Sequence, residues 1–170
     1  MNLMVAPDYG TYAEVAITLA GFTGLVGVIV SRGEHKLTET QAMHIANLLM
    51  STMFVVILSL VPHLIWNYPM EAEDRWIWCI RVVLVFHLAA WAIFGYFARP
   101  GGFALKNFPA IERTIVYMFA PFGIGLVLAE IFVLTSNSIR LAPFVYECVL
   151  LILMLGAMSN FLVLLLRPNR

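Results

Sequence analysis

The most constraining feature of this 170-residue chain is a series of five long apolar segments separated by short polar breaks. The segments are residues 11–31, 41–66, 76–98, 113–136 and 141–166. An α-helix needs roughly 20 mostly apolar residues to cross about 30 Å of hydrocarbon, and each segment reaches that length. Only 12% of the residues are charged, whereas soluble domains carry about 25%. We therefore expect an all-α, polytopic integral membrane helix bundle with five transmembrane helices.

The polar breaks are too short to contain a soluble domain. In the first break, Thr38 precedes Gln41 by three residues, the spacing of a helix capping box. The last break, residues 137–140, is the shortest, and Pro143 beside it favours a tight helical hairpin over one continuous helix. We expect a single transmembrane domain over residues 1–170, with any function inside the bundle or on its loops.

Basic residues in the breaks indicate the orientation, because cytoplasmic loops are enriched in Lys and Arg. With the N-terminus outside, the inner segments would contain Arg32, Lys36, Arg99, Lys106, Arg113, Arg167 and Arg170. The outer segments would contain only Arg75 and Arg140. This bias predicts the N-terminus outside and the C-terminus inside. Six aromatic residues are expected at the outer interface, where such rings prefer to lie: Tyr9, Tyr12, Trp66, Tyr68, Trp76 and Trp78.

Ionisable residues inside predicted spans are functional candidates, because burying them in lipid is costly. They are Arg81, Glu130 and Glu147, with Glu14 near the start of the first span. At 1.5 Å per residue, the first three lie roughly 8–9 Å inside the outer boundary. We expect an intramembrane charge cluster in which one carboxylate pairs with Arg81 and the other exchanges protons or holds a cation. The alternative is a structural ion pair that joins three helices.

The second predicted span carries a polar stripe that covers about half of the helix circumference. Its members are His44, Asn47, Ser51, Ser59 and His63. Such a stripe has to face protein or water rather than lipid. It would either line a conduction path or form interhelical hydrogen bonds.

His87 lies near the middle of the third span, on a different face from Arg81. It is either an interhelical hydrogen-bonding residue or a proton relay. Axial histidines of a haem lie at matching depth, whereas His63 and His87 differ by roughly 12 Å. No catalytic or metal-binding motif appears, so we predict no catalytic residue, metal or cofactor, and the balance is against an enzyme. Cys79 and Cys148 are expected as buried apolar residues, with an interhelical disulfide as the alternative.

Small residues form a row along the first span. Ala16, Ala20 and Gly24 are spaced by four, which lets helix backbones approach closely. This row predicts a helix-packing face, either within one chain or between copies.

The fourth span contains a group of helix-disrupting residues, Pro121, Gly123 and Gly125. They predict a kink or a break in the helix. Broken helices form ion and substrate sites in transporters, but a plain packing kink explains the same residues.

Residues 13–24, AEVAITLAGFTG, resemble the first span of small bacterial membrane proteins that carry an A-E…L-A-G-F-x-G pattern. Those polytopic proteins are themselves uncharacterised, and the likeness covers this span alone. The resemblance implies the bacterial inner membrane and gives no activity.

Three classes of function remain. We predict that the protein oligomerises to form an ion- or proton-conducting path through a charged and polar interior. The alternative is a non-enzymatic integral subunit or assembly factor of a larger membrane complex, and an intramembrane enzyme is the third class. The expected partners are membrane lipids and either further copies of the chain or other membrane subunits. Nucleic acid is not expected, because the net charge is zero and no basic run exists.

Overall fold

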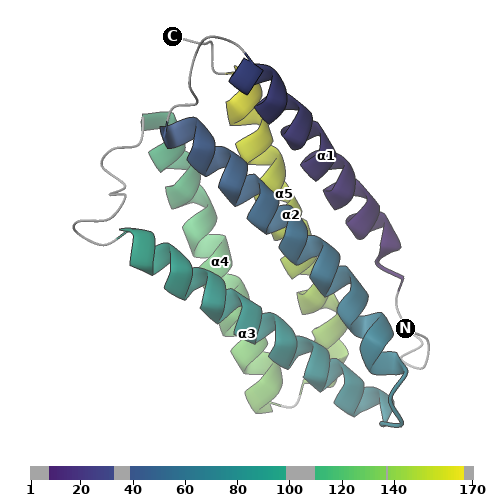
Figure 1. The fold of residues 1–170 in the computed structure, drawn as a ribbon. Helices are drawn as coiled ribbons and strands as arrows, with labels where there is room; N and C mark the ends of the chain where they lie inside the picture. Colours follow the sequence, from purple (N-terminus) through teal and green to yellow (C-terminus); the bar gives the residue numbers. More distant parts are fainter. Residues whose placement is uncertain (1–7, 33–38, 99–109, 137, 167–170) are drawn as a thin grey trace. The chain divides into compact units, whose positions relative to one another are not determined.

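All regular structure in the described part of the chain is helical. The computed structural model describes residues 8–32, 39–98, 110–136 and 138–166 (Figure 1). The described residues form five α-helices, with a short 3₁₀ turn, η2 (Ile139–Leu141), before the last one. The helices are α1 (Gly10–Arg32), α2 (Glu39–Trp66), α3 (Ala72–Ala98), α4 (Ala110–Ser136) and α5 (Ala142–Leu166). The predicted all-α architecture and the number of helices are confirmed.

Within the described residues, three helices contain stretches that are long and apolar enough to cross a membrane. These stretches are His44–Trp66, Ala72–Ala92 and Ile139–Leu165. A shorter apolar stretch, Ala120–Ser136, lies in α4. Length and composition thus support a membrane protein.

Local signals explain where several helices begin and end. The Asp8 carboxylate accepts a hydrogen bond of 2.8 Å from the Gly10 N–H, which satisfies one of the exposed donors at the start of α1. Glu73 and Asp74 lie in the first turn of α3, where negative charge complements the helix dipole. Thr38, the expected cap of α2, lies outside the described residues.

The chain divides into two units by internal contacts. Among the described residues, unit 1 comprises 61–149, which includes α3, α4, η2, the end of α2 and the start of α5. Unit 2 comprises 8–60 and 150–166, which includes α1 and the larger parts of α2 and α5.

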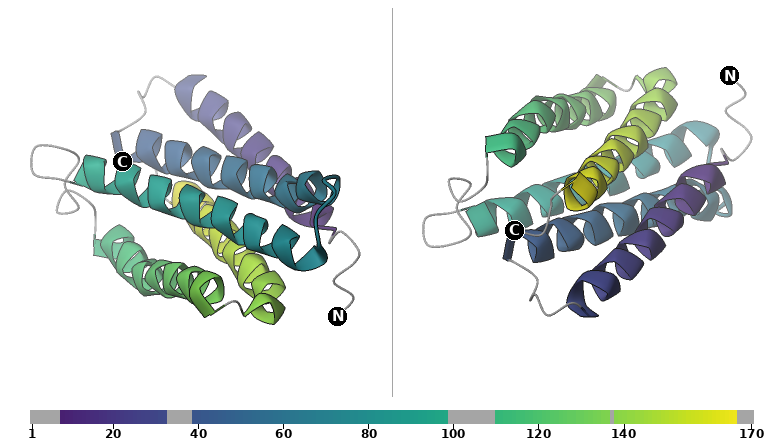
Figure 2. Two further views of the ribbon diagram at one scale, coloured as in Figure 1. Left: turned by 90° about the horizontal axis from the view of Figure 1, so that it is seen from below. Right: turned by 90° about the horizontal axis from the view of Figure 1, so that it is seen from above.

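The core of unit 1 forms where α3 meets α4 and η2. α3 and α4 contact each other: they cross in Figure 1 and lie beside each other in the left view of Figure 2. Helical spacing explains the buried stripe on each: residues 76, 80, 83 and 87 on α3, and residues 126, 130 and 133 on α4. The opposite face of α3, including Val85 and Leu88, is exposed. Apolar side chains on such a face are suited to lipid contact.

The core of unit 2 is formed by residues of α1, α2 and α5. Ala16 of α1, Leu48 and Val55 of α2, and Leu150 and Ala157 of α5 are fully buried. Thr23 is also buried, and its hydroxyl donates to the Leu19 carbonyl at 2.7 Å, so this polar group is satisfied within its own helix.

Candidate functional site

A buried histidine–glutamate pair joins α3 to α4 in unit 1. His87 Nδ1 lies 2.7 Å from Glu130 Oε1, which is a short hydrogen bond between two ionisable groups. The side chain of His87 is 11% exposed and that of Glu130 is 0% exposed. The structure therefore places His87 in an interhelical hydrogen bond, with the imidazole at the more accessible end of the pair.

The register of the two helices brings this pair together. His87 follows Val83 by four residues in the buried stripe of α3, and Glu130 lies between Leu126 and Val133 in that of α4. Farther along α3, Trp91 packs on Gly123, where an added Cβ would lie 3.2 Å from the indole Cζ2. Residue 91 meets 123 and residue 87 meets 130, so the helices run antiparallel. Gly123 provides space for the Trp91 indole, about one turn from His87 on α3 and about two turns from Glu130 on α4.

A proton can move between the two partners without changing the net charge of the pair. In one form, imidazolium Nδ1–H donates to the carboxylate, and in the other, the carboxylic acid donates to neutral Nδ1. Both forms are neutral overall, which suits apolar surroundings better than a single charge does. The second carboxyl oxygen, Oε2, is buried and has no hydrogen-bond partner among the described residues. Among the described residues, the Glu130 carboxyl group is thus hydrogen-bonded only through Oε1, to His87.

Within unit 1, the other two members of the predicted charge cluster, Arg81 and Glu147, do not pair with Glu130. Arg81, Glu147 and Glu14 are all exposed. The Arg81 guanidinium lies 4.9 Å from the centre of the Trp78 ring, on the exposed side of α3. Position 81 falls outside the buried stripe of α3, so a similar depth in the membrane does not bring Arg81 to Glu130.

The predicted polar stripe of α2 does not share one environment. His44 and Ser59 are buried, Asn47 and Ser51 are half-buried, and His63 is exposed. The Ser59 hydroxyl donates to a backbone carbonyl of its own helix at 2.7 Å.

His44 makes an interhelical bond in unit 2. Its Nδ1 lies 2.9 Å from Asn160 Oδ1, and the Asn160 amide nitrogen donates to the Gly156 carbonyl at 2.9 Å. Because the amide nitrogen is used there, Oδ1 is the acceptor and His44 Nδ1 carries the hydrogen.

The small-residue row of α1 is buried at only one end. Ala16 is fully buried, Ala20 is half-buried and Gly24 is exposed. A Cβ added at Gly21 or Gly24 would meet nothing within 4 Å among the described residues. This part of the row is therefore not a tight contact within the described chain.

The predicted disruption of α4 does not break the helix. α4 is continuous from Ala110 to Ser136 with Pro121 inside it. Gly123 accommodates Trp91, whereas a Cβ at Gly125 would meet no described neighbour within 4 Å. A broken-helix site of the transporter kind is thus not formed at this point.

An aromatic cluster lies at the start of α3. Trp76, one of the aromatic residues predicted at the outer membrane interface, is buried among its neighbours, with 1% of its surface exposed. Its ring packs edge-on against Trp66 and Tyr146, with centroid separations of 5.2 and 6.1 Å. Periodicity carried a signal for this burial, because Trp76 shares the helical face of Ile80, Val83 and His87. Cys79 and Cys148 are both free thiols.

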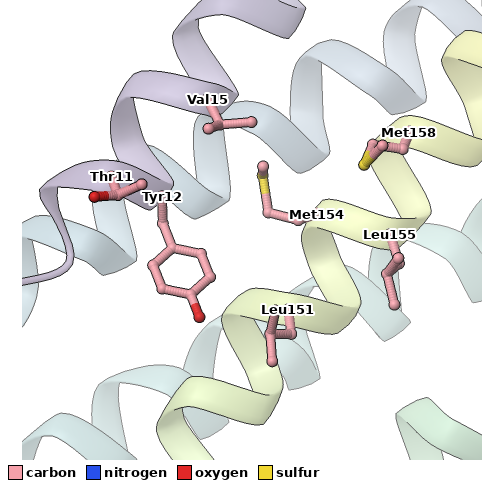
Figure 3. Close-up of a pocket in the computed structure, with 7 residues that line it drawn as sticks. All are labelled: Thr11, Tyr12, Val15, Leu151, Met154, Leu155 and Met158. Carbon is pink, nitrogen blue, oxygen red and sulfur yellow. The ribbon is translucent and has the colours of Figure 1, made fainter.

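Unit 2 contains an apolar hollow of about 230 Å³ between α1 and α5. In Figure 3, Val15 and Tyr12 from α1 face Met154 and Leu151 from α5. Its lining contains no charged side chain. It therefore offers no polar route for an ion.

No group of three or more His, Cys, Asp or Glu residues suited to a metal ion occurs in the part of the chain that the structure describes. Comparison of the chain with protein-family models, with curated proteins and with solved structures finds no match.

Proposed function

We propose that this chain is an integral membrane protein that transfers protons within the bilayer, with His87 and Glu130 as the transfer site. The observation that carries the proposal is the 2.7 Å hydrogen bond between two buried ionisable side chains in an apolar helix pair. Ionisable residues at such depth are typical of proton relays. Imidazole is suited to this role because it can bind a proton on one nitrogen and release another from the second.

The direction of transfer follows from the exposure of the two groups. His87 is the partly accessible member, so it receives a proton at Nε2 and passes one from Nδ1 to Glu130 Oε1. The cycle is complete when the Glu130 carboxyl group releases its proton to water or to a polar group of a partner chain and the imidazole returns to the tautomer with hydrogen on Nδ1. Glu130, which is fully buried, stores the proton between transfers.

The proposal includes five membrane crossings with the N-terminus outside, supported by the excess of Lys and Arg in the predicted inner segments. It also includes self-association in a bacterial inner membrane. A second copy, or another membrane subunit, would supply polar groups that connect His87 with water. A reporter fused to the C-terminus is expected on the inner side, and its detection outside would overturn this topology.

Proton flux into liposomes tests the proposal directly. The purified protein is reconstituted with a pH-sensitive dye inside, and a potassium gradient with valinomycin drives proton entry. Glu130→Gln keeps the size and a hydrogen-bonding oxygen but removes the exchangeable acid, so flux should fall at least tenfold. Glu147→Gln is the matched control, because Glu147 is exposed, and it should conduct like the wild type. Wild-type flux through Glu130→Gln would refute the proposal.

The second candidate is a non-enzymatic subunit of a larger membrane complex. The open space beside Gly21 and Gly24 on α1 favours it, because small residues let a foreign helix approach closely. In that case the wild type shows no flux, and Glu130→Gln lowers stability alone. Crosslinking from position 24 would then capture a different membrane protein rather than a second copy.

A further inference from the structure

Three buried N–H donors gather where α2 turns into α3. They are Trp66 Nε1, Arg75 Nε and Trp76 Nε1, and none has a hydrogen-bond acceptor among the described residues. The three side chains are in contact: the Arg75 guanidinium lies 5.7 Å from the Trp66 ring centre, and the two indole rings are 5.2 Å apart. All belong to unit 1.

The unsatisfied groups of this cluster all need the same kind of partner, a hydrogen-bond acceptor. Every unsatisfied group in it is a donor, and one of the three carries a permanent positive charge. Buried donors without acceptors are destabilising, and native proteins retain few of them. A group that satisfies several donors and a guanidinium together must offer several oxygen acceptors and negative charge. Phosphate meets that description.

Neighbouring carboxylates narrow the choice of ligand. Glu71, Glu73 and Asp74 are exposed beside Arg75. Arg75 lies over the Trp66 ring instead of pairing with them, and its Nη2 donates to the Tyr68 carbonyl at 3.4 Å. A simple anion would be repelled by three carboxylates. A zwitterion that carries both a phosphate and an ammonium group would match the donors and the carboxylates together.

The position of the turn indicates where such a zwitterion comes from. The stretches His44–Trp66 and Ala72–Ala92 are long and apolar enough to cross a membrane. The residues between them therefore lie at the level of lipid headgroups. Leu64 and Trp78 are exposed next to the turn, at 59% and 46%, and offer apolar surface to an acyl chain.

We propose that the α2–α3 turn binds the headgroup of an amine-bearing zwitterionic phospholipid. The phosphate accepts hydrogen bonds from Arg75, Trp66 and Trp76, and the ammonium group lies among Glu71, Glu73 and Asp74. Arg75 and Trp66 are half-buried and form the outer wall, with Trp76 behind them. Binding moves the guanidinium off the Trp66 ring and uncovers the indole N–H groups. The site is separate from His87 and Glu130, so it does not depend on proton transfer.

Native mass spectrometry of the full chain, released from detergent micelles, tests this site. Four probes are compared: phosphatidylethanolamine, phosphatidylglycerol with the same chains, diacylglycerol and inorganic phosphate. Phosphatidylethanolamine should be retained best, phosphatidylglycerol less, and diacylglycerol not at all. Equal retention of all three lipids would overturn the proposal. Binding of inorganic phosphate as tight as that of phosphatidylethanolamine would show that free phosphate, and not a lipid, is the ligand.

Variants separate a headgroup site from an ordinary aromatic core. Trp76→Phe and Arg75→Gln should each weaken phosphatidylethanolamine binding roughly tenfold or more, the effect of losing one charge-assisted hydrogen bond. Arg81→Gln is the matched control for Arg75→Gln on the same helix, and it should bind like the wild type. Trp76→Phe removes an unsatisfied donor, so its melting temperature should not fall. Unchanged binding in Trp76→Phe and Arg75→Gln would refute the site.

A third variant tests the site without changing the buried aromatic side chains, whose substitution could disturb folding. Replacing Glu71, Glu73 and Asp74 by their amides alters exposed side chains only. It should abolish the preference for phosphatidylethanolamine over phosphatidylglycerol. A preference that survives this change would show that the carboxylates do not bind the ammonium group.

Discussion

Removing one partner of the His87–Glu130 pair should destabilise the protein more than removing both. In His87→Phe, the carboxyl group loses its bond to Nδ1, and its Oε2 has no partner among the described residues. A fully buried carboxyl without a partner costs about 3 kcal/mol. In Glu130→Leu, the remaining imidazole is 11% exposed, so its cost should be about 1–2 kcal/mol.

The double variant His87→Phe/Glu130→Leu removes both polar groups and should lie within about 1 kcal/mol of the wild type. The two single costs add to about 4–5 kcal/mol, so the coupling energy should be about 3–5 kcal/mol. Unfolding by SDS in mixed micelles, followed by tryptophan fluorescence, measures all four proteins. A double variant whose loss equals the sum of the single losses, within about 0.5 kcal/mol, would refute the reasoning.

The same double variant distinguishes structural from functional importance. If the pair transfers protons, the double variant should be as stable as the wild type and show no flux in liposomes. A pair that only holds α3 against α4 predicts unchanged behaviour in both measurements. Stability and flux therefore have to be measured on the same preparations.

Two further predictions concern helix packing and an interhelical hydrogen bond. Gly125→Ala should stabilise α4 by up to about 1 kcal/mol through helix propensity, because the added Cβ meets no described neighbour within 4 Å. Gly123→Ala should stabilise α4 less, because its Cβ would lie 3.2 Å from Trp91. Thermal unfolding of the two variants compares them, and an equal gain would show that the indole moves freely. Asn160→Leu leaves the His44 Nδ1–H without its 2.9 Å acceptor and should cost about 1–2 kcal/mol. An unchanged melting temperature would contradict this assignment of the hydrogen bond.

The sequence predicts how deep a residue lies along its helix, but it does not predict which neighbouring helix the residue faces. Glu130 and His87 were both recognised as unusual, because a carboxylate and an imidazole stand in apolar runs. Their pairing was not foreseen. Depth along a span follows from counting residues at 1.5 Å each, and depth alone grouped Glu130 with Arg81 and Glu147. Each residue also turns the helix by about 100°, so the facing direction has to be known as well.

Trp76 shows that a predicted depth along a helix leaves the burial of the side chain undetermined. Its place in the chain, just after an acidic loop, is typical of an interfacial aromatic residue. It is buried because α3 turns this residue, along with Ile80 and Val83, toward its neighbours. The burial also removes its indole N–H from any acceptor in the described chain, and the proposed lipid site depends on that fact.

The sequence by itself determined the helices. Long apolar runs, separated by charged or proline-containing breaks, predict five helices, and the described residues form these five. A helix satisfies the hydrogen bonds of its own backbone, so each run can form one without a partner. The tertiary structure decided which ionisable groups lie inside. The antiparallel register of α3 and α4 brings His87 within 2.7 Å of Glu130 and leaves Arg81 exposed. Which ionisable residues are buried depends on how α3 and α4 pack against each other, and the sequence pattern of one helix does not determine that packing.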